Sequence, residues 1–177
     1  MRSTNIIKAE ISDSMEIAKL IKDGWNAAYN GIISDEYLKN MNIEDLSENW
    51  KNKIQTNNNV YIYKEEKKIL GVIIFGESED KSINDTGEIF VLYVKVEEKR
   101  KGIGTQLLNF AKNQLIKEGY TKMIIWCLMG NKEGSNFYKK CGGIKLKERD
   151  YILGGIEIRE KGFLYDITTE RRNNNVE

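Results

Sequence analysis

The sequence predicts an α/β fold with a mixed central sheet of six to seven strands flanked by helices. Short apolar, β-branched segments alternate with segments whose apolar residues recur at helical spacing. Near the C-terminus, a glycine pair at 154–155 separates two strand-like segments and predicts a hairpin. The length of 177 residues suits one domain, which we place at 1–167. The polar residues 168–177 are expected to form a disordered tail.

The first half of the chain is expected to contain helices between a short strand and a hairpin. Asp13 and Glu16 make a capping-box pattern before the first helix, and Gly31 follows its last apolar position. Ser34 is expected to cap a short second helix. The expected segments are the strand 5–10, helical stripes over 17–28 and 43–54, and hairpin strands at 60–63 and 69–75.

The second half is expected to alternate strands and helices before the final hairpin. Asn131 opens a short helix that Gly142 and Gly143 close. The expected segments are the strand 88–94, a helix from 105 to about 118, the strand 122–128, the helix after 131, and hairpin strands at 144–153 and 156–167.

The turn between strand 88–94 and the following helix has the composition of an anion-binding loop. It contains three consecutive cations, Lys99, Arg100 and Lys101, followed by Gly102 and Gly104. Glycines allow a ligand to approach the backbone closely, and a helix N-terminus supplies unpaired N–H donors and a partial positive charge. The turn therefore suits a pyrophosphate. The alternative is an ordinary turn with a solvated basic loop.

Two other phosphate motifs are excluded at this turn. A dinucleotide-binding fingerprint requires a third glycine where the chain has Leu107, and no Walker A sequence is present.

The composition excludes several classes of function. The chain has no histidine, which removes Ser-His-Asp and Cys-His catalysis and all His-containing zinc sites. Its two cysteines, Cys127 and Cys141, are expected to be reduced thiols, and no metal is expected. A net charge of +1 gives no overall field for nucleic acid or anionic membrane. No apolar run approaches membrane-spanning length, so we expect a cytoplasmic protein.

Two motifs resemble those of the Gcn5-related N-acetyltransferase (GNAT) family. Residues 92–104 resemble motif A, whose signature is Arg/Gln-x-x-Gly-x-Gly/Ala, and residues 131–142 resemble motif B in order and spacing. Residues 25–33 are similar to the N-terminal helical segment of small bacterial members, and the likeness covers about 5 to 167. This chain departs from the pattern at Lys99, which replaces Arg or Gln, and at Gly134, where Ala or Ser is common.

The resemblance implies the acyl-CoA N-acyltransferase fold, acetyl-CoA as donor and an amine as acceptor, with direct transfer in a ternary complex. Asn131 would bind the pantetheine arm and Tyr138 would face the thioester sulfur. The remaining residues that the resemblance assigns to CoA are Leu92, Tyr93 and Val94 for pantetheine, and Lys99, Arg100, Lys101, Gly102, Ile103, Gly104 and Thr105 for the pyrophosphate.

Catalysis without histidine has to use other acids and bases. Glu88 lies eleven residues before Lys99, the offset at which histone-acetyltransferase relatives carry their catalytic glutamate, and is the candidate base. A strand-end acid on the surface is the alternative. Tyr138 is the candidate acid, although it could be a core aromatic, a role that suits Phe137 better. Three aromatics, Trp25, Tyr29 and Trp126, could line the acceptor cleft, and all three could also belong to the core.

Two other functions stay open at this point. A non-catalytic acyl-CoA sensor would keep the anion-binding turn without turnover, and a nucleotide-binding protein would require the motif B match to be chance. The sequence does not identify the acceptor, which could be a polyamine, an aminoglycoside, an amino acid, a peptide N-terminus or a protein lysine. We expect a monomer or a homodimer.

Overall fold

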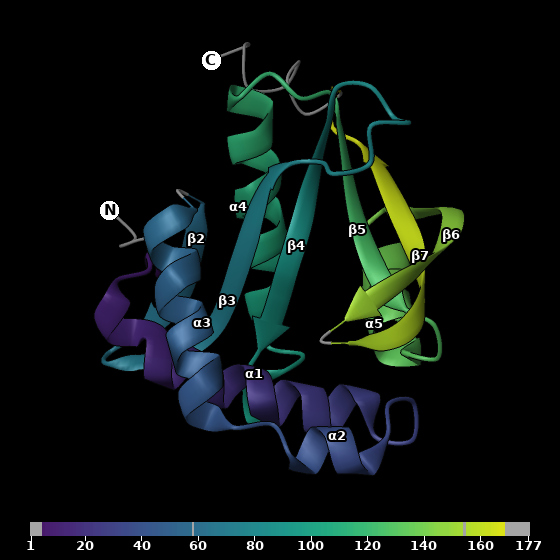
Figure 1. Ribbon diagram of the computed structural model, residues 1–177. Coiled ribbons are helices and arrows are strands. Elements are labelled where there is room, and N and C mark those ends of the chain that lie inside the picture. The colour runs from purple at the N-terminus through teal and green to yellow at the C-terminus, as the bar shows by residue number, and fades with distance from the viewer. Residues whose placement is uncertain (1–4, 58, 154, 169–177) are drawn as a thin grey trace. The chain divides into compact units, whose positions relative to one another are not determined.

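The computed structural model describes residues 5–57, 59–153 and 155–168. Most of the tail predicted at 168–177 and Gly154 of the predicted hairpin turn therefore lie outside the described residues. Within the described ranges the chain forms seven strands and five α-helices (Figure 1).

The strands form a mixed sheet in the order β1-β2-β3-β4-β5-β7-β6, which confirms the predicted α/β class. Strands β4 and β5 pair in parallel, whereas β1–β2, β2–β3, β5–β7 and β6–β7 pair antiparallel. The strands are β1 Ile6–Lys8, β2 Val60–Glu65, β3 Lys68–Glu77, β4 Thr86–Val94, β5 Lys122–Leu128, β6 Ile144–Leu153 and β7 Ile156–Asp166.

The helices follow the predicted stripes, with one difference in capping. Ser34 caps α2 by accepting from the Tyr37 backbone N–H, as predicted. The capping box predicted from Asp13 to Glu16 was wrong, because Asp13 accepts from the Glu10 backbone N–H at 2.9 Å. Glu16 accepts instead from the Ile69 N–H at 2.8 Å. The helices are α1 Ser14–Tyr29, α2 Asp35–Lys39, α3 Ile43–Thr56, α4 Ile103–Lys117 and α5 Lys132–Lys140.

The chain contains two compact units, and β3, β4 and α4 each continue from one unit into the other. The first unit comprises the described residues up to 74 together with 91–109. Its core joins one face of α1 and α3 to the buried side chains of β2 and β3, including Ile17, Trp50 and Ile62. The second unit comprises 75–90 and the described residues from 110 onward. Phe75, Met123 and Phe163 are among its fully buried side chains.

Candidate active site

The basic turn leads directly into α4 in the first unit. Gly102 has φ +90°, a conformation that side chains with a Cβ rarely adopt, and Arg100 also has positive φ, at +64°. Helix α4 begins at Ile103, so Gly104 lies in its first turn, where backbone N–H groups have no helical acceptor. The sequence predicted the helix to begin just after Gly104. The geometry is that of an anion-binding helix N-terminus.

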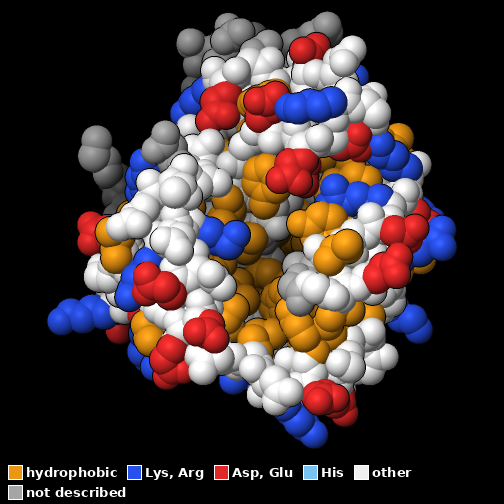
Figure 2. All heavy atoms as spheres, viewed as in Figure 1, with side chains coloured by type: hydrophobic (Ala, Val, Ile, Leu, Met, Phe, Trp, Pro, Cys, Tyr) orange, Lys and Arg blue, Asp and Glu red, His pale blue; other side chains and the backbone are white. Residues whose placement is uncertain are grey.

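The charges of this turn are partly compensated. Lys101 forms an ion pair at 2.8 Å with Glu98, which is the last residue of a short 3-10 turn at Val96–Glu98. Arg100 is exposed. Lys95 and Glu97 form a second pair in the preceding residues, at 3.0 Å. Charged residues of both signs are also interspersed over the face shown in Figure 2, as the net charge of +1 suggests.

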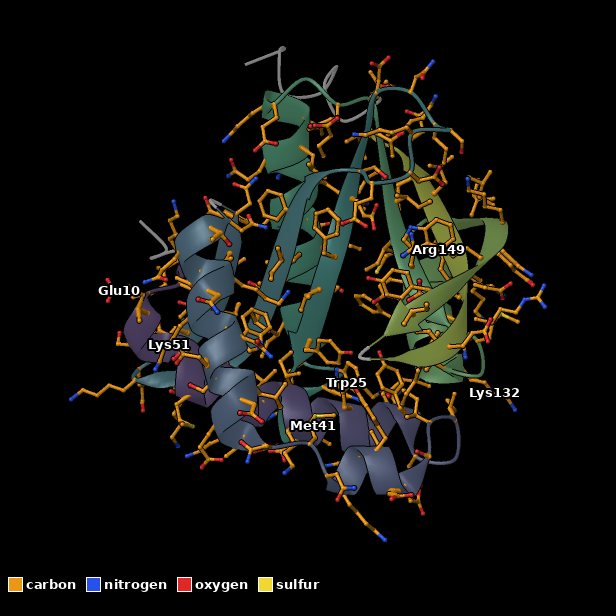
Figure 3. All side chains as sticks on the ribbon, viewed as in Figure 1. Glu10, Trp25, Met41, Lys51, Lys132 and Arg149 are labelled. Atoms are coloured by element: carbon orange, nitrogen blue, oxygen red, sulfur yellow. The ribbon has the colours of Figure 1, made fainter. Side chains whose placement is uncertain are left out.

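The strand residues assigned to pantetheine, Leu92, Tyr93 and Val94, are partly buried in the first unit. The Tyr93 hydroxyl lies 2.7 Å from that of Tyr29. Tyr29 also contacts Trp25, with ring centroids 5.3 Å apart, and Figure 3 shows Trp25 projecting from α1. The structure thus brings two of the predicted acceptor-site aromatics, Trp25 and Tyr29, together with one predicted CoA-binding residue, Tyr93.

Glu88 is buried in the second unit. It is the third residue of β4 and only 2% exposed, so the interpretation as a surface acid at the strand end was wrong. Ser78 Oγ donates to its carboxylate at 2.8 Å and the Glu79 backbone N–H donates at 3.2 Å. Burial raises the pKa of Glu88, while the hydrogen bond from Ser78 and the charge of Arg149 oppose that rise. These neighbours belong to no motif, so the sequence did not indicate them.

Helix α5 carries the two motif B candidates, also in the second unit. Asn131 is its N-cap, and its Oδ1 accepts from the Gly134 backbone N–H at 2.9 Å. A contact of this side chain with a carbonyl acceptor would come from its donor group, Nδ2. Tyr138 is 9% exposed, and its ring lies 5.7 Å from that of Phe163.

The burial of the two adjacent aromatics reverses what the sequence suggested. Phe137 is only partly buried, whereas Tyr138 is buried. The expectation that Phe137 suits the core better was therefore wrong, because position 138 faces β7.

A pocket of about 410 Å³ opens in the second unit. Its polar residues are largely paired: Lys147 forms an ion pair with Asp80 and donates a hydrogen bond to Ser82 Oγ at 2.7 Å. Although burial alone would raise the pKa of Asp80, the hydrogen bonds from Lys147 and Ser82 lower it to about 2. The pocket is lined by Glu79, Asp80, Trp126, Lys147, Glu148 and Arg149.

The described residues contain no group of three or more histidine, cysteine or acidic side chains that could hold a metal ion. None of their helices is long and apolar enough to cross a membrane.

The mixed sheet and the glycine turn that opens α4 define the fold of the acyl-CoA N-acyltransferases. The model of the acetyltransferase (GNAT) family matches residues 22–143, and the chain belongs to that family. This match confirms the resemblance to the GNAT family that the two motifs indicated. The members of this family are N-acetyltransferases, so the protein is an enzyme of this class.

Related proteins agree with this assignment. The chain is 26% identical over 156 residues to the uncharacterized N-acetyltransferase YuaI of Bacillus subtilis, covering 88% of each chain. It is 29% identical over 154 residues to the spermidine N(1)-acetyltransferase of Thermoplasma acidophilum, covering 84% of this chain and 92% of the relative.

Solved structures share the fold. The PaiA N-acetyltransferase of Thermoplasma acidophilum, crystallised in complex with coenzyme A, superposes with a TM-score of 0.68 at 25% identity, covering 88% of this chain and 96% of that one. An N-acetyltransferase of Staphylococcus aureus has a TM-score of 0.68 at 17% identity, covering 92% and 98%, and shows the fold alone.

Proposed function

We propose that the protein transfers the acetyl group of acetyl-CoA directly to a primary amine of a small molecule or peptide. The observation that carries this proposal is the turn before α4, where Gly102 at φ +90° leads into a helix N-terminus flanked by cations. Membership of the GNAT family and the coenzyme A complex of the PaiA protein support acetyl-CoA as the donor.

In this proposal the backbone N–H groups of Gly102 to Thr105 bind the pyrophosphate, and Lys99 to Lys101 add positive charge. Leu92, Tyr93 and Val94 pair with the pantetheine arm, and Asn131 donates to it through Nδ2. The N-cap bond of Asn131 supports this last role, since it fixes the side chain and orients the amide.

Two residues are proposed to move protons. Glu88, whose pKa burial raises, accepts a proton from the acceptor ammonium, directly or through water. The amine then attacks the thioester carbonyl, and Tyr138 protonates the departing thiolate.

Trp25 and Tyr29 are proposed to contribute to acceptor binding. We also retain one domain over 1–167, a cytoplasmic location and a monomer or homodimer as predictions.

The test of the overall function is an acetyl-transfer screen over amine classes, with products identified by mass spectrometry. Spermidine belongs in this screen, because a relative with 29% identity is named for it. Transfer to at least one amine, with CoA released in equal amount, is the expected result. Binding of acetyl-CoA without transfer to any amine would favour a non-catalytic sensor instead.

The role of Tyr138 is tested by Tyr138→Phe, which removes the hydroxyl and keeps the ring packed against Phe163. We expect kcat to fall by about 10²-fold or more, with little change in the affinity for acetyl-CoA. The defect should shrink with a thioester whose thiol has a lower pKa, because a better leaving group needs less protonation. If this variant keeps the wild-type kcat, Tyr138 is a core residue and not the acid.

A further inference from the structure

The pocket in the second unit contains a pre-organised arginine. Arg149 lies opposite Glu160 in the β6–β7 register, and its Nε donates to a Glu160 oxygen at 2.9 Å. The guanidinium lies 4.0 Å from the Trp126 ring centroid and 4.8 Å from that of Tyr151. Figure 3 shows Arg149 in this part of the sheet. An arginine fixed on two rings and one carboxylate loses little entropy when its other N–H groups bind a ligand.

The indole that supports Arg149 has a polar group without a partner. Trp126 Nε1 is the one buried side-chain nitrogen or oxygen that lacks a hydrogen-bond partner among the described residues. A buried donor left without an acceptor costs about 1–3 kcal/mol, so such groups usually have an explanation in function. Trp126 also lines the pocket. The group that Trp126 Nε1 lacks is a hydrogen-bond acceptor.

The charges around this pair favour a neutral acceptor over an anion. The Arg149 charge is already balanced by Glu160, with Nη2 at 2.9 Å from the carboxylate. Lys147 pairs with Asp80, and Glu148 pairs with both Lys145 and Arg159. A carbonyl oxygen would satisfy the donors without adding charge. A second cation on the Trp126 face would instead meet the guanidinium already stacked there.

The pocket also contains a carboxylate without an ion pair among the described residues. Glu79 lines the pocket, and its backbone N–H binds Glu88, the proposed base. An ammonium group is therefore favoured at the Glu79 carboxylate. The pocket thus offers a carboxylate for an amine and N–H donors for a neutral oxygen.

We propose that this pocket binds an acceptor whose amine is adjacent to a neutral carbonyl, namely a peptide N-terminus or an amino-acid amide, and that Arg149 determines this specificity. The ammonium pairs with the Glu79 carboxylate, whose backbone N–H binds Glu88, and the carbonyl oxygen accepts from Arg149 and from Trp126 Nε1. This inference rests on the proposed N-acetyltransferase function and assigns the class of its acceptor.

The test compares L-alaninamide with isopropylamine, which replaces the amide by a methyl group. The measured quantity is the ratio of kcat/KM for the two amines, taken in wild type and in Arg149→Met. We expect the ratio to fall by roughly 10- to 100-fold in the variant, the range for a lost hydrogen bond to a charged group. Arg159→Met is the matched control on the same hairpin, because Arg159 is 64% exposed. It should keep the wild-type ratio.

A binding measurement keeps the proposal testable if Arg149→Met folds poorly. The indole N–H resonance of Trp126, assigned with Trp126→Phe, should move downfield when L-alaninamide is added to the wild-type protein with bound CoA. Isopropylamine should leave it in place. In Arg149→Lys, both the preference for L-alaninamide and the downfield shift of the Trp126 resonance should be partly lost. Lysine keeps the charge but lacks the planar head that stacks on the rings.

The outcomes separate the two proposals. Transfer to several amines with spermidine strongly preferred, or a ratio unchanged in Arg149→Met, would overturn the carbonyl specificity and leave the acetyltransferase function standing. No transfer to any amine would overturn both. If the kcat/KM ratio falls equally in Arg159→Met, the effect of Arg149 comes from its charge in general. That result would also overturn the specificity.

Discussion

The basic turn before α4 and the surroundings of Glu88 use opposite physical means to prepare a site. The turn keeps its cation Arg100 exposed and presents backbone N–H groups at a helix end. Glu88 is 2% exposed, and its pKa is raised because burial disfavours the charged form. One region should therefore respond to salt and to steric blocking of the backbone, and the other to pH.

The largest expected effect comes from the buried region. Glu88→Gln keeps the shape of the side chain and removes its basicity, so kcat/KM should fall by about 10²–10⁴-fold. The loss should be greatest just above the raised pKa of Glu88, where the carboxylate is ionised and the amine is still protonated. It should shrink as the pH approaches the pKa of the amine. A pH–rate profile of both proteins measures this.

A loss of equal size at every pH would contradict the assignment of Glu88 as the base. Glu88 would then position the amine without accepting its proton. Ser78→Ala is a useful companion, since it removes the strongest hydrogen bond to the carboxylate, which opposes the rise in pKa. It should move the acidic limb of the wild-type profile to higher pH.

The second effect concerns the exposed region. Gly104→Val should abolish the rise in melting temperature that acetyl-CoA gives the wild-type protein, because a side chain in the first turn of α4 blocks the approach of the phosphates. Gly104 is the better target, since a side chain at Gly102 would also be strained at φ +90°. Thermal denaturation with and without acetyl-CoA provides the measurement.

The control for this variant is Asn109→Val, an exposed position of the same helix. It introduces the same β-branched side chain into α4, and valine and asparagine have about equal helix propensity. It should keep the full acetyl-CoA effect. If Gly104→Val keeps it as well, the turn is not the phosphate site.

A smaller effect distinguishes the cations of the turn. The affinity for CoA should fall several-fold as salt rises, because screening shortens from about 10 Å at 0.1 M to about 3 Å at 1 M. Arg100→Gln should flatten this dependence more than Lys101→Gln, because Lys101 is already paired with Glu98 at 2.8 Å. Calorimetric titrations at several salt concentrations test this. If the affinity for CoA does not change with salt, the residues Lys99 to Lys101 form a solvated loop without a role in binding.

The smallest effect is on stability. The folded-state pKa of Glu88 lies above its unfolded value of about 4.3, so the contribution of the protonated, buried side chain is present below that value. It is lost as the pH rises through the folded pKa. The melting temperature of Glu88→Gln relative to wild type should therefore increase across this range. Glu79→Gln, an exposed neighbour, should show a much flatter difference.

The sequence predicted those parts of the molecule that depend on local pattern. Strand β5 at Lys122–Leu128 matches the predicted range, and Ser34 and Asn131 cap the helices they were expected to cap. Local pattern failed at Glu16, whose bond to Ile69 joins residues 53 positions apart. A capping motif does not indicate whether a distant donor competes for the same carboxylate.

The same limit applies to the candidate site. The glycine turn is a contiguous motif, so its residues were found together. The neighbours of Glu88 were not, because Ser78 lies in a polar loop and Arg149 on a distant strand. The burial of Tyr138 relative to Phe137 also depends on β7, where Phe163 faces the helix. Pairings between distant strands carry no short signal in the sequence.

The N-cap of α5 couples the stability of the helix to the orientation of Asn131. Gly134 weakens its helix by about 0.5–1 kcal/mol relative to alanine, and a Cβ there would lie 2.8 Å from the Asn131 amide nitrogen. Because that nitrogen is the end of a side chain, a shift of the amide accommodates alanine. The gain in helix propensity therefore comes with a displacement of the donor that is proposed to bind the cofactor.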